Sequence, residues 1–187
     1  VRSIIDGLNL GLESKKDSQD ICFVPDGDYA EFIESYTGKK YPCGDFLDLT
    51  GKVIGTHNGA VGYTLGQRKG LGIGGRKESL FIIGTDVKEN VVYVGEGDSH
   101  PGLHRRALRI QPEEVHWIDP SEAMKEGERR RYMVRIRYRQ PLQGAELICD
   151  NDGMYILFDE PQRGITAGQF AAWYSGDVLA GSGVIER

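Results

Sequence analysis

Residues 146–158 read ELICD-NDG-MYILF, and this stretch carries the pattern that decides the fold. Two short runs rich in apolar residues, Glu146 to Asp150 and Met154 to Phe158, flank the segment Asn151-Asp152-Gly153. Asn, Asp and Gly favour tight turns, so the stretch predicts two strands joined by a turn. The chain contains 26 glycines and 7 prolines, which is consistent with many such turns.

The same alternation of short runs and turns extends in both directions from this stretch. Further strands are predicted at Arg105 to Ile110, Arg131 to Gln140, Gln169 to Tyr174 and Val178 to Gly181. Ser175-Gly176-Asp177 supplies another turn between the last two of these strands. About six short strands at this spacing are typical of a small closed or nearly closed β-barrel.

The part of the chain before residue 100 has a different pattern. Leu80 to Asp86 and Asn90 to Val94 are rich in β-branched and aromatic residues, and their short connection predicts a β-hairpin. Asp28, with Glu31 three residues later, resembles a capping box at the start of a helix. The helix would carry its larger side chains on one face, namely Tyr29, Phe32, Ile33 and Tyr36.

We therefore predict a mainly β protein with a minor helical part. The segment Glu96 to Gly102 contains two glycines and a proline and is the natural boundary between two units. The predicted organisation is a first segment with a short helix (1–42), a small β-rich central domain (43–100) and a C-terminal β-barrel (101–187).

The composition is that of a globular protein, with 39% hydrophobic and 27% charged residues. Apolar runs such as Leu80 to Ile83 are far shorter than the ~20 residues that span a bilayer. The first six residues, Val1 to Asp6, include acidic and polar residues where a secretion signal needs an apolar stretch, so we expect a cytoplasmic protein that does not bind membranes. Three cysteines without a Cys-x-x-Cys pair argue against a zinc site or a disulfide framework. His100 and His104 have the spacing of two ligands on one helix, but Pro101 and Gly102 break such a helix, so no metal site is predicted.

Cys22 lies in the most suggestive stretch of the sequence, between a polar segment that contains two lysines and the predicted helix. A lone cysteine in an apolar run is usually a buried core residue. Nearby cationic groups and a helix N-terminus, however, lower the pKa of a thiol and favour the reactive thiolate. From residue types alone, both interpretations of Cys22 stay open.

Six arginines fall within eleven positions: Arg129, Arg130, Arg131, Arg135, Arg137 and Arg139. If residues 131–140 form one extended strand, Arg135, Arg137 and Arg139 share one face of it. Aromatic and β-branched side chains then line the opposite face: Tyr132, Val134, Ile136 and Tyr138. A charge run is usually a solvated sheet face, but an arginine row in a protein of net charge −5 also suits contact with an RNA backbone.

The glycine cluster from Gly70 to Gly75 invites a nucleotide-binding interpretation, which we reject. A dinucleotide-binding loop requires a following helix, whereas this loop leads into the strand predicted at Leu80. The neighbouring Gln67-Arg68-Lys69 segment either contacts RNA phosphates or is a tight loop with solvated charges.

Several motifs along the chain resemble those of tRNA-specific 2-thiouridylases. The resemblance begins at Lys15-Lys16-Asp17-Ser18-Gln19-Asp20-Ile21-Cys22-Phe23 and continues at Gly44-Asp45-Phe46, Gly51 to Gly55, His57-Asn58-Gly59, Tyr63 to Ile73, Val134 to Arg139, Phe158 to Pro161, Thr166 to Gln169 and Gly181 to Ile185. The motifs follow one another in order and cover nearly the whole chain.

The resemblance implies an enzyme that transfers persulfide sulfur to C2 of the wobble uridine (U34) of tRNA after ATP- and Mg²⁺-dependent adenylation. Cys22 matches the cysteine that carries the persulfide, which a cysteine desulfurase or sulfur-relay protein supplies. Arg137, Tyr138 and Gln169 match residues that contact the tRNA anticodon arm, and Arg68, Lys69 and Arg135 are weaker candidates. The barrel is similar to the second domain of translation elongation factors.

The resemblance also implies that the ATP-binding half, with a first catalytic cysteine that forms a disulfide with Cys22, lies outside this sequence. Residues 1–42 would then be the edge of the catalytic domain, and the chain alone is expected to be inactive and to bind no cofactor. Cys43 and Cys149 lie outside the recognised motifs and are expected to be packing residues. Two alternatives are a non-catalytic RNA-binding barrel with a structural Cys22, and a thiol redox enzyme in which Cys43 approaches Cys22.

Overall fold

The computed structural model describes residues 29–186, and the chain divides into two compact units, 1–42 and 43–187. The described part of the first unit contains helix α2 (Tyr29–Thr37), where the sequence predicts a helix. Its C-terminus has a glycine cap, because Gly38 has a φ of 67° and donates its N–H to the carbonyl of Glu34 at 2.8 Å. Phe32 and Tyr36 stack on one side of this helix, 6.1 Å apart. Asp28, the predicted N-cap, lies outside the described residues.

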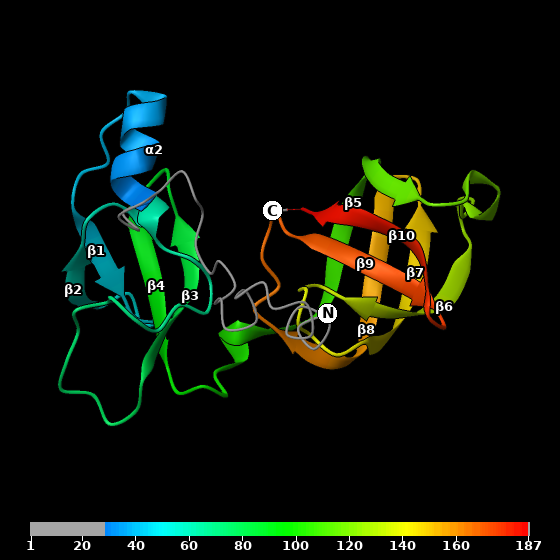
Figure 1. Ribbon diagram of the computed structural model, residues 1–187. Helices are drawn as coiled ribbons and strands as arrows, with labels where there is room; N and C mark the ends of the chain where they lie inside the picture. Colours follow the sequence, from blue (N-terminus) through cyan, green and yellow to red (C-terminus); the bar gives the residue numbers. More distant parts are fainter. Residues whose placement is uncertain (1–28, 187) are drawn as a thin grey trace, which may run out of the picture. The chain divides into compact units, whose positions relative to one another are not determined.

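The second unit begins with a four-stranded sheet in the order β2-β1-β4-β3 (Figure 1). Its strands are β1 (Gly44–Leu47), β2 (Val53–His57), β3 (Leu80–Asp86) and β4 (Val91–Glu96). The predicted hairpin is confirmed, because β3 and β4 pair antiparallel. The β1–β4 pair is parallel, and its residues are more than 40 positions apart in the sequence (for example Phe46 with Val92).

The six remaining strands form a closed barrel in the order β10-β5-β8-β7-β6-β9, which confirms the predicted fold class (Figure 1). They are β5 (His104–Trp117), β6 (Arg129–Arg135), β7 (Gln143–Asp150), β8 (Gly153–Arg163), β9 (Phe170–Ser175) and β10 (Val178–Ile185). The stretch 146–158 is the β7–β8 hairpin, in which Asp150 pairs with Gly153. β5 and β8 are longer than predicted, because a strand with one solvated face tolerates many polar residues.

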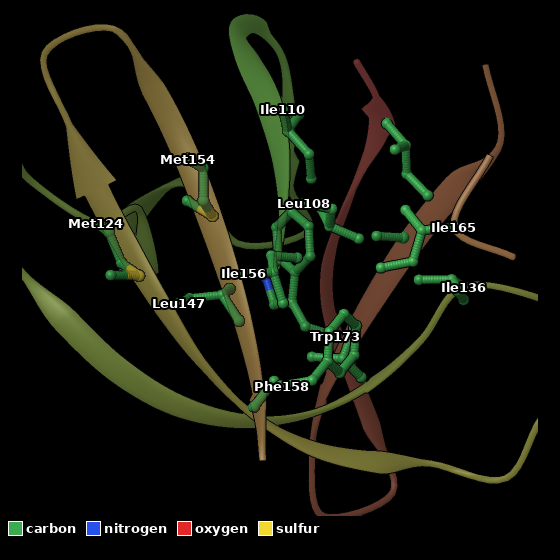
Figure 2. Packing of buried hydrophobic residues seen from close by; sticks show 14 residues of the cluster. Leu108, Ile110, Met124, Ile136, Leu147, Met154, Ile156, Phe158, Ile165 and Trp173 are labelled. Atoms are coloured by element: carbon green, nitrogen blue, oxygen red, sulfur yellow. The ribbon is translucent and has the colours of Figure 1, made fainter. Parts of the chain in front are cut away.

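The interior of the barrel is filled by side chains from all six strands (Figure 2). Along β8, Met154, Ile156 and Phe158 are buried, whereas Leu157 between them is 38% exposed. This alternation follows from the two-residue period of a strand. Trp173 on β9 is fully buried within this cluster, and the ring of Trp117 meets it edge-on at 5.4 Å.

The strand predicted at Arg131 to Gln140 is wrong in its second half. β6 ends at Arg135, and residues 136–140 turn away from the sheet. The side-chain oxygen of Gln140 accepts the backbone N–H of Ile136 at 2.9 Å, and the N–H of Gln140 binds the carbonyl of Arg137 at 3.1 Å. These local bonds replace the ladder bonds of an extended strand, so the predicted row of three arginines on one face does not form. The prediction placed Tyr138 on the same strand face as Ile136. In the structure Ile136 is buried, whereas Tyr138 is 89% exposed.

The expectation that both Cys43 and Cys149 pack inside the protein is half wrong. Cys149 is partly buried against the barrel core, but Cys43 is exposed, and both are free thiols. The domain limits predicted at 42/43 and 100/101 stay predictions, although the sheet strands end at Glu96 and the barrel strands begin at His104. Within residues 29–186, no helix has the length and hydrophobicity that a membrane span requires.

Candidate nucleic-acid interface

The three arginines at the start of the cluster are engaged in ion pairs across the barrel surface. Arg129 meets Glu146 on β7 at 3.1 Å, and Arg130 meets Glu128 at 2.8 Å. Arg131 binds both carboxylate oxygens of Asp159, at 2.8 and 2.5 Å, and this hydrogen-bonded pairing lowers the pKa of the Asp159 carboxyl. Each of these positive charges therefore has a carboxylate nearby, which reduces its attraction for an RNA phosphate.

Two of the later arginines, Arg135 and Arg137, lie at a hollow on the barrel surface, which we call the barrel concavity. It has a volume of about 530 Å³ and is lined by Arg135, Ile136, Arg137, Tyr138, Gln169, Phe170, Ala172 and Tyr174. These residues come from two segments that the antiparallel pairing of β6 with β9 brings together, with Arg135 opposite Ala172. The barrel concavity thus unites four predicted binding residues: Arg135, Arg137, Tyr138 and Gln169.

Both arginines of the barrel concavity are held by neighbouring groups. The guanidinium of Arg135 lies over the ring of Tyr174, 4.9 Å from its centroid, and donates to the carbonyl of Tyr138 at 3.3 Å. The guanidinium of Arg137 donates to the carbonyl of Gly164 at 2.6 Å. A guanidinium carries five N–H donors, so each keeps capacity for a further acceptor such as a phosphate oxygen.

The remaining wall of the barrel concavity is aromatic and exposed. Tyr138 is 89% exposed, and Phe170 at the start of β9 is 63% exposed. Gln169 precedes Phe170, and its main chain is fixed by bonds to Thr166 (3.3 Å) and Ile185 (2.8 Å). Its side chain is exposed. Aromatic rings beside arginines form the combination that binds bases and phosphates of single-stranded nucleic acids.

A second hollow, of about 610 Å³, contains the weaker candidate Arg68. Its lining includes Gln67, Arg68, Arg137, Arg163 and Asp98. Arg163 lies over the ring of Phe81, 4.9 Å from its centroid, and is 3.9 Å from Asp98. Arg137 lines both hollows, whereas Lys69 is exposed and lines neither of them.

The sequence interpretation missed Phe170, Tyr174 and Arg163. A signal for Phe170 was present, because Phe170-Ala171-Ala172-Trp173 must bury alternate residues in a strand. With Ala171 and Trp173 buried, the large apolar side chain of Phe170 faces outward. The sequence gives no such signal for Arg163, because the position of its side chain depends on Phe81 and Asp98, which are distant in the sequence.

Neither the glycine-rich loop nor the acidic residues form a cofactor site among the described residues. The loop at Gly70 to Gly75 leads into β3 rather than a helix. Within residues 29–186, no group of three or more His, Cys, Asp or Glu side chains is placed to hold a metal ion.

Cys22, the predicted sulfur carrier, lies outside the described residues. Of the two described cysteines, Cys149 has a pKa raised by burial and by the nearby carboxylates of Glu128, Glu126 and Asp150. A raised pKa disfavours the reactive thiolate.

Comparison with known proteins covers both parts of the structure. Residues 30–96 match the family model "tRNA methyl transferase PRC-barrel domain", and residues 106–185 match "Aminomethyltransferase beta-barrel domain". The chain is 43% identical to the tRNA-specific 2-thiouridylase MnmA of Christiangramia forsetii, over 99% of this chain and 55% of that protein. It is also 43% identical to the MnmA of Halalkalibacterium halodurans, over 100% of this chain and 49% of that protein.

The chain is 40% identical to the MnmA of Pseudomonas aeruginosa, over 100% of this chain and 49% of that protein. It thus spans about half the length of the curated relatives it matches. The similarity runs through the sheet and the barrel alike, as the motifs in the sequence indicate. The chain belongs to the tRNA-specific 2-thiouridylase family, in which it corresponds to the central and C-terminal β-rich domains.

Proposed function

We propose that this chain binds tRNA and contains the sulfur-carrying cysteine of an enzyme that converts uridine to 2-thiouridine. The observation that supports the tRNA-binding part is the barrel concavity, where four of the residues predicted to bind tRNA line one hollow. A chain of net charge −5 binds RNA only through locally concentrated positive charge, and the barrel concavity contains two arginines and no acidic lining residue.

In this proposal, Cys22 carries the sulfur as a persulfide. The outer sulfur of the persulfide attacks C2 of the wobble uridine (U34), whose C2 oxygen has been activated by ATP-dependent adenylation and departs with AMP. The thiolate of a second cysteine then attacks Sγ of Cys22 and breaks its bond to the transferred sulfur, which stays on the uridine. The resulting disulfide between the two cysteines is reopened by a reductant. We assign no part of the ATP or magnesium chemistry to residues 29–186. The persulfide comes from a cysteine desulfurase or a sulfur-relay protein.

The proposed roles at the barrel follow from the chemistry of each side chain. Arg135 and Arg137 bind phosphates of the anticodon arm, because charge-assisted hydrogen bonds to phosphate are short and strong. Tyr138 offers an exposed ring, and Gln169 offers both a donor and an acceptor to a base edge or ribose. Arg68 in the second hollow adds a further phosphate contact.

Replacing Cys22 separates sulfur delivery from RNA binding. In the intact enzyme, we expect Cys22→Ser to abolish 2-thiouridine formation, because a hydroxyl cannot carry a persulfide. Its Kd for tRNA should remain within about twofold of the wild-type value, since the barrel concavity is unchanged. Nucleoside analysis of the tRNA and filter binding measure the two quantities.

Cys43→Ser is the matched control, because it removes an exposed free thiol outside the recognised motifs. This variant should thiolate tRNA at the wild-type rate. Thiolation that survives in Cys22→Ser would contradict the sulfur-carrier role. Loss of thiolation in both variants would instead favour a redox pair of Cys22 and Cys43.

A further inference from the structure

We infer that the barrel concavity holds one unstacked base of the RNA against the rings of Phe170 and Tyr138, which makes Phe170 a binding residue. This inference rests on the proposed function, and it adds what the site recognises: an unpaired nucleotide rather than a double helix. Phe170 has no part in the family resemblance described above, so its role comes from the structure alone.

The exposure of Phe170 is the first reason. Within the described residues, most large apolar side chains of the barrel are buried, whereas the Phe170 ring is 63% exposed at the rim of a hollow. Tyr138 lines the same hollow and is 89% exposed. Contiguous exposed apolar surface beside a hollow marks a binding site, because covering it with a ligand is favourable.

The arrangement along β9 keeps the hollow open between its rings. Phe170, Ala172 and Tyr174 are alternate residues of one strand and share its outer face. Ala172 in the middle has the smallest side chain of the three, so space remains above it. The face of Tyr174 is already covered by the guanidinium of Arg135 at 4.9 Å. Phe170 and Tyr138 are therefore the rings whose faces remain for a ligand.

The charges around the hollow favour a nucleotide over an apolar protein segment. Arg135 and Arg137 stand in the same wall as the rings, and no residue that lines the barrel concavity is acidic. Arg137 also lines the second hollow, where Arg68 supplies further positive charge and Arg163 lies 3.9 Å from Asp98. When a base stacks on these rings, the nearby arginines can bind the phosphates on either side of it, as in grooves that bind single-stranded nucleic acids.

The geometry of RNA then decides which nucleotides fit. In a double helix each base is stacked between its neighbours, so its faces cannot meet a protein ring. Bases in loops and single strands can splay out and stack on aromatic side chains. The barrel concavity should therefore prefer a hairpin loop to a duplex of the same stem.

The test measures Kd by fluorescence anisotropy for the intact protein with two labelled RNAs, a stem-loop and a blunt duplex with the same stem sequence. Phe170→Leu keeps an apolar side chain but removes the ring, and we expect it to raise the Kd for the stem-loop about tenfold. Phe170→Trp should bind the stem-loop at least as tightly as the wild type. Phe170→Leu should leave the Kd for the duplex and the salt dependence of binding unchanged, because no charge is altered.

Val178→Ala is the matched control, because Val178 on β10 is 68% exposed but does not line the barrel concavity. It should leave both Kd values at the wild-type level. Arg137→Ala tests the proposed function separately. It should weaken binding of both RNAs and lower the slope of log K against log salt by about one.

The outcomes distinguish the two claims. If Arg137→Ala weakens binding but Phe170→Leu does not, the base-stacking inference is wrong and the proposed function stands. Base stacking is also refuted if Phe170→Leu raises the Kd for the stem-loop and the duplex equally. It is likewise refuted if Val178→Ala raises the Kd for the stem-loop as much as Phe170→Leu does. If the protein binds neither RNA, both claims fail. A loss of self-association in Phe170→Leu with unchanged RNA binding would identify the hollow as a protein contact instead.

Discussion

The imidazole of His57 is buried beside two aromatic rings in the part of the chain that forms the sheet. It is 2% exposed, and its ring lies 5.1 Å from that of Phe46 and 5.4 Å from that of Tyr63, both in edge-on geometry. Neither ring nitrogen has a hydrogen-bond partner among residues 29–186. Burial lowers the pKa of His57, because the charged form loses its hydration; the carboxylate of Asp45 and the backbone groups of Asp45 and Asn90 near the ring oppose this only in part.

Stability of the sheet should consequently fall in mild acid. The unfolded chain takes up a proton on this histidine near pH 6.5, whereas the folded protein does so only at lower pH. The stability contributed by neutral His57 is thus complete above about pH 6.5 and is lost as the pH falls through the lowered pKa. We expect His57→Phe to make the free energy of unfolding less dependent on pH between about 5 and 7.

Urea denaturation followed by circular dichroism at several pH values measures this effect. His116→Phe at an exposed position should retain the wild-type pH dependence. If the stability of His57→Phe falls as steeply with decreasing pH as that of the wild type, His57 is not the source of the pH dependence.

At the scale of elements, β10 depends on a glycine where the register of the barrel changes. The pairing of β10 with β9 shifts between Leu179 and Gly181. A Cβ atom at Gly181 would lie 2.5 Å from the carbonyl oxygen of His116 and 2.7 Å from the ring of Trp173. Neither neighbour can move easily, since one is backbone and the other is fully buried.

Gly181→Ala should therefore destabilise the barrel by about 1–3 kcal/mol through overpacking. Both tryptophans of the chain, Trp117 and Trp173, belong to the barrel, so their fluorescence reports its unfolding in urea. Gly74→Ala is the control, because a Cβ there would meet no atom within 4 Å. If the urea midpoint of unfolding of Gly181→Ala is equal to or higher than that of the wild type, a Cβ at residue 181 does not clash with its neighbours.

At the scale of the whole molecule, two hydrophobic cores serve two parts of the second unit. One cluster fills the barrel and includes Ile156 and Trp173, and the other fills the sheet and includes Phe46 and Ile82. The two clusters share no residue. Damage to one core should thus remain largely local, because apolar contacts act only between touching side chains.

Ile156→Ala should lower the stability of the barrel by about 2–5 kcal/mol. Hydrogen exchange measured by mass spectrometry should then accelerate in β5 to β10, with little change in β3 and β4. Leu157→Ala is a control on the same strand, because Leu157 points outward and is 38% exposed. Equal acceleration in the sheet and the barrel would indicate a single cooperative core.

Much of this protein was determined by the sequence itself. The bounds of β3 agree with the prediction at both ends, and the six barrel strands occur where turn residues separate apolar runs. These features are local, because residue alternation and turn chemistry act between neighbours along the chain. The motifs around Tyr63 to Ile73 and Val134 to Arg139 likewise predicted the family to which the chain belongs. The role of Cys22 stays a prediction.

The binding surface was decided by tertiary structure. β6 ends at Arg135 because the side chain of Gln140 bonds to the main chain of Ile136, which no residue period predicts. Asp159 and Glu146 pair with two of the arginines, whereas Arg135 and Arg137 line the barrel concavity. Phe170 joins them only because β9 pairs with β6 in a closed barrel. Pairing between distant strands depends on the register of the whole sheet, and that register is a property of the folded chain rather than of any one segment.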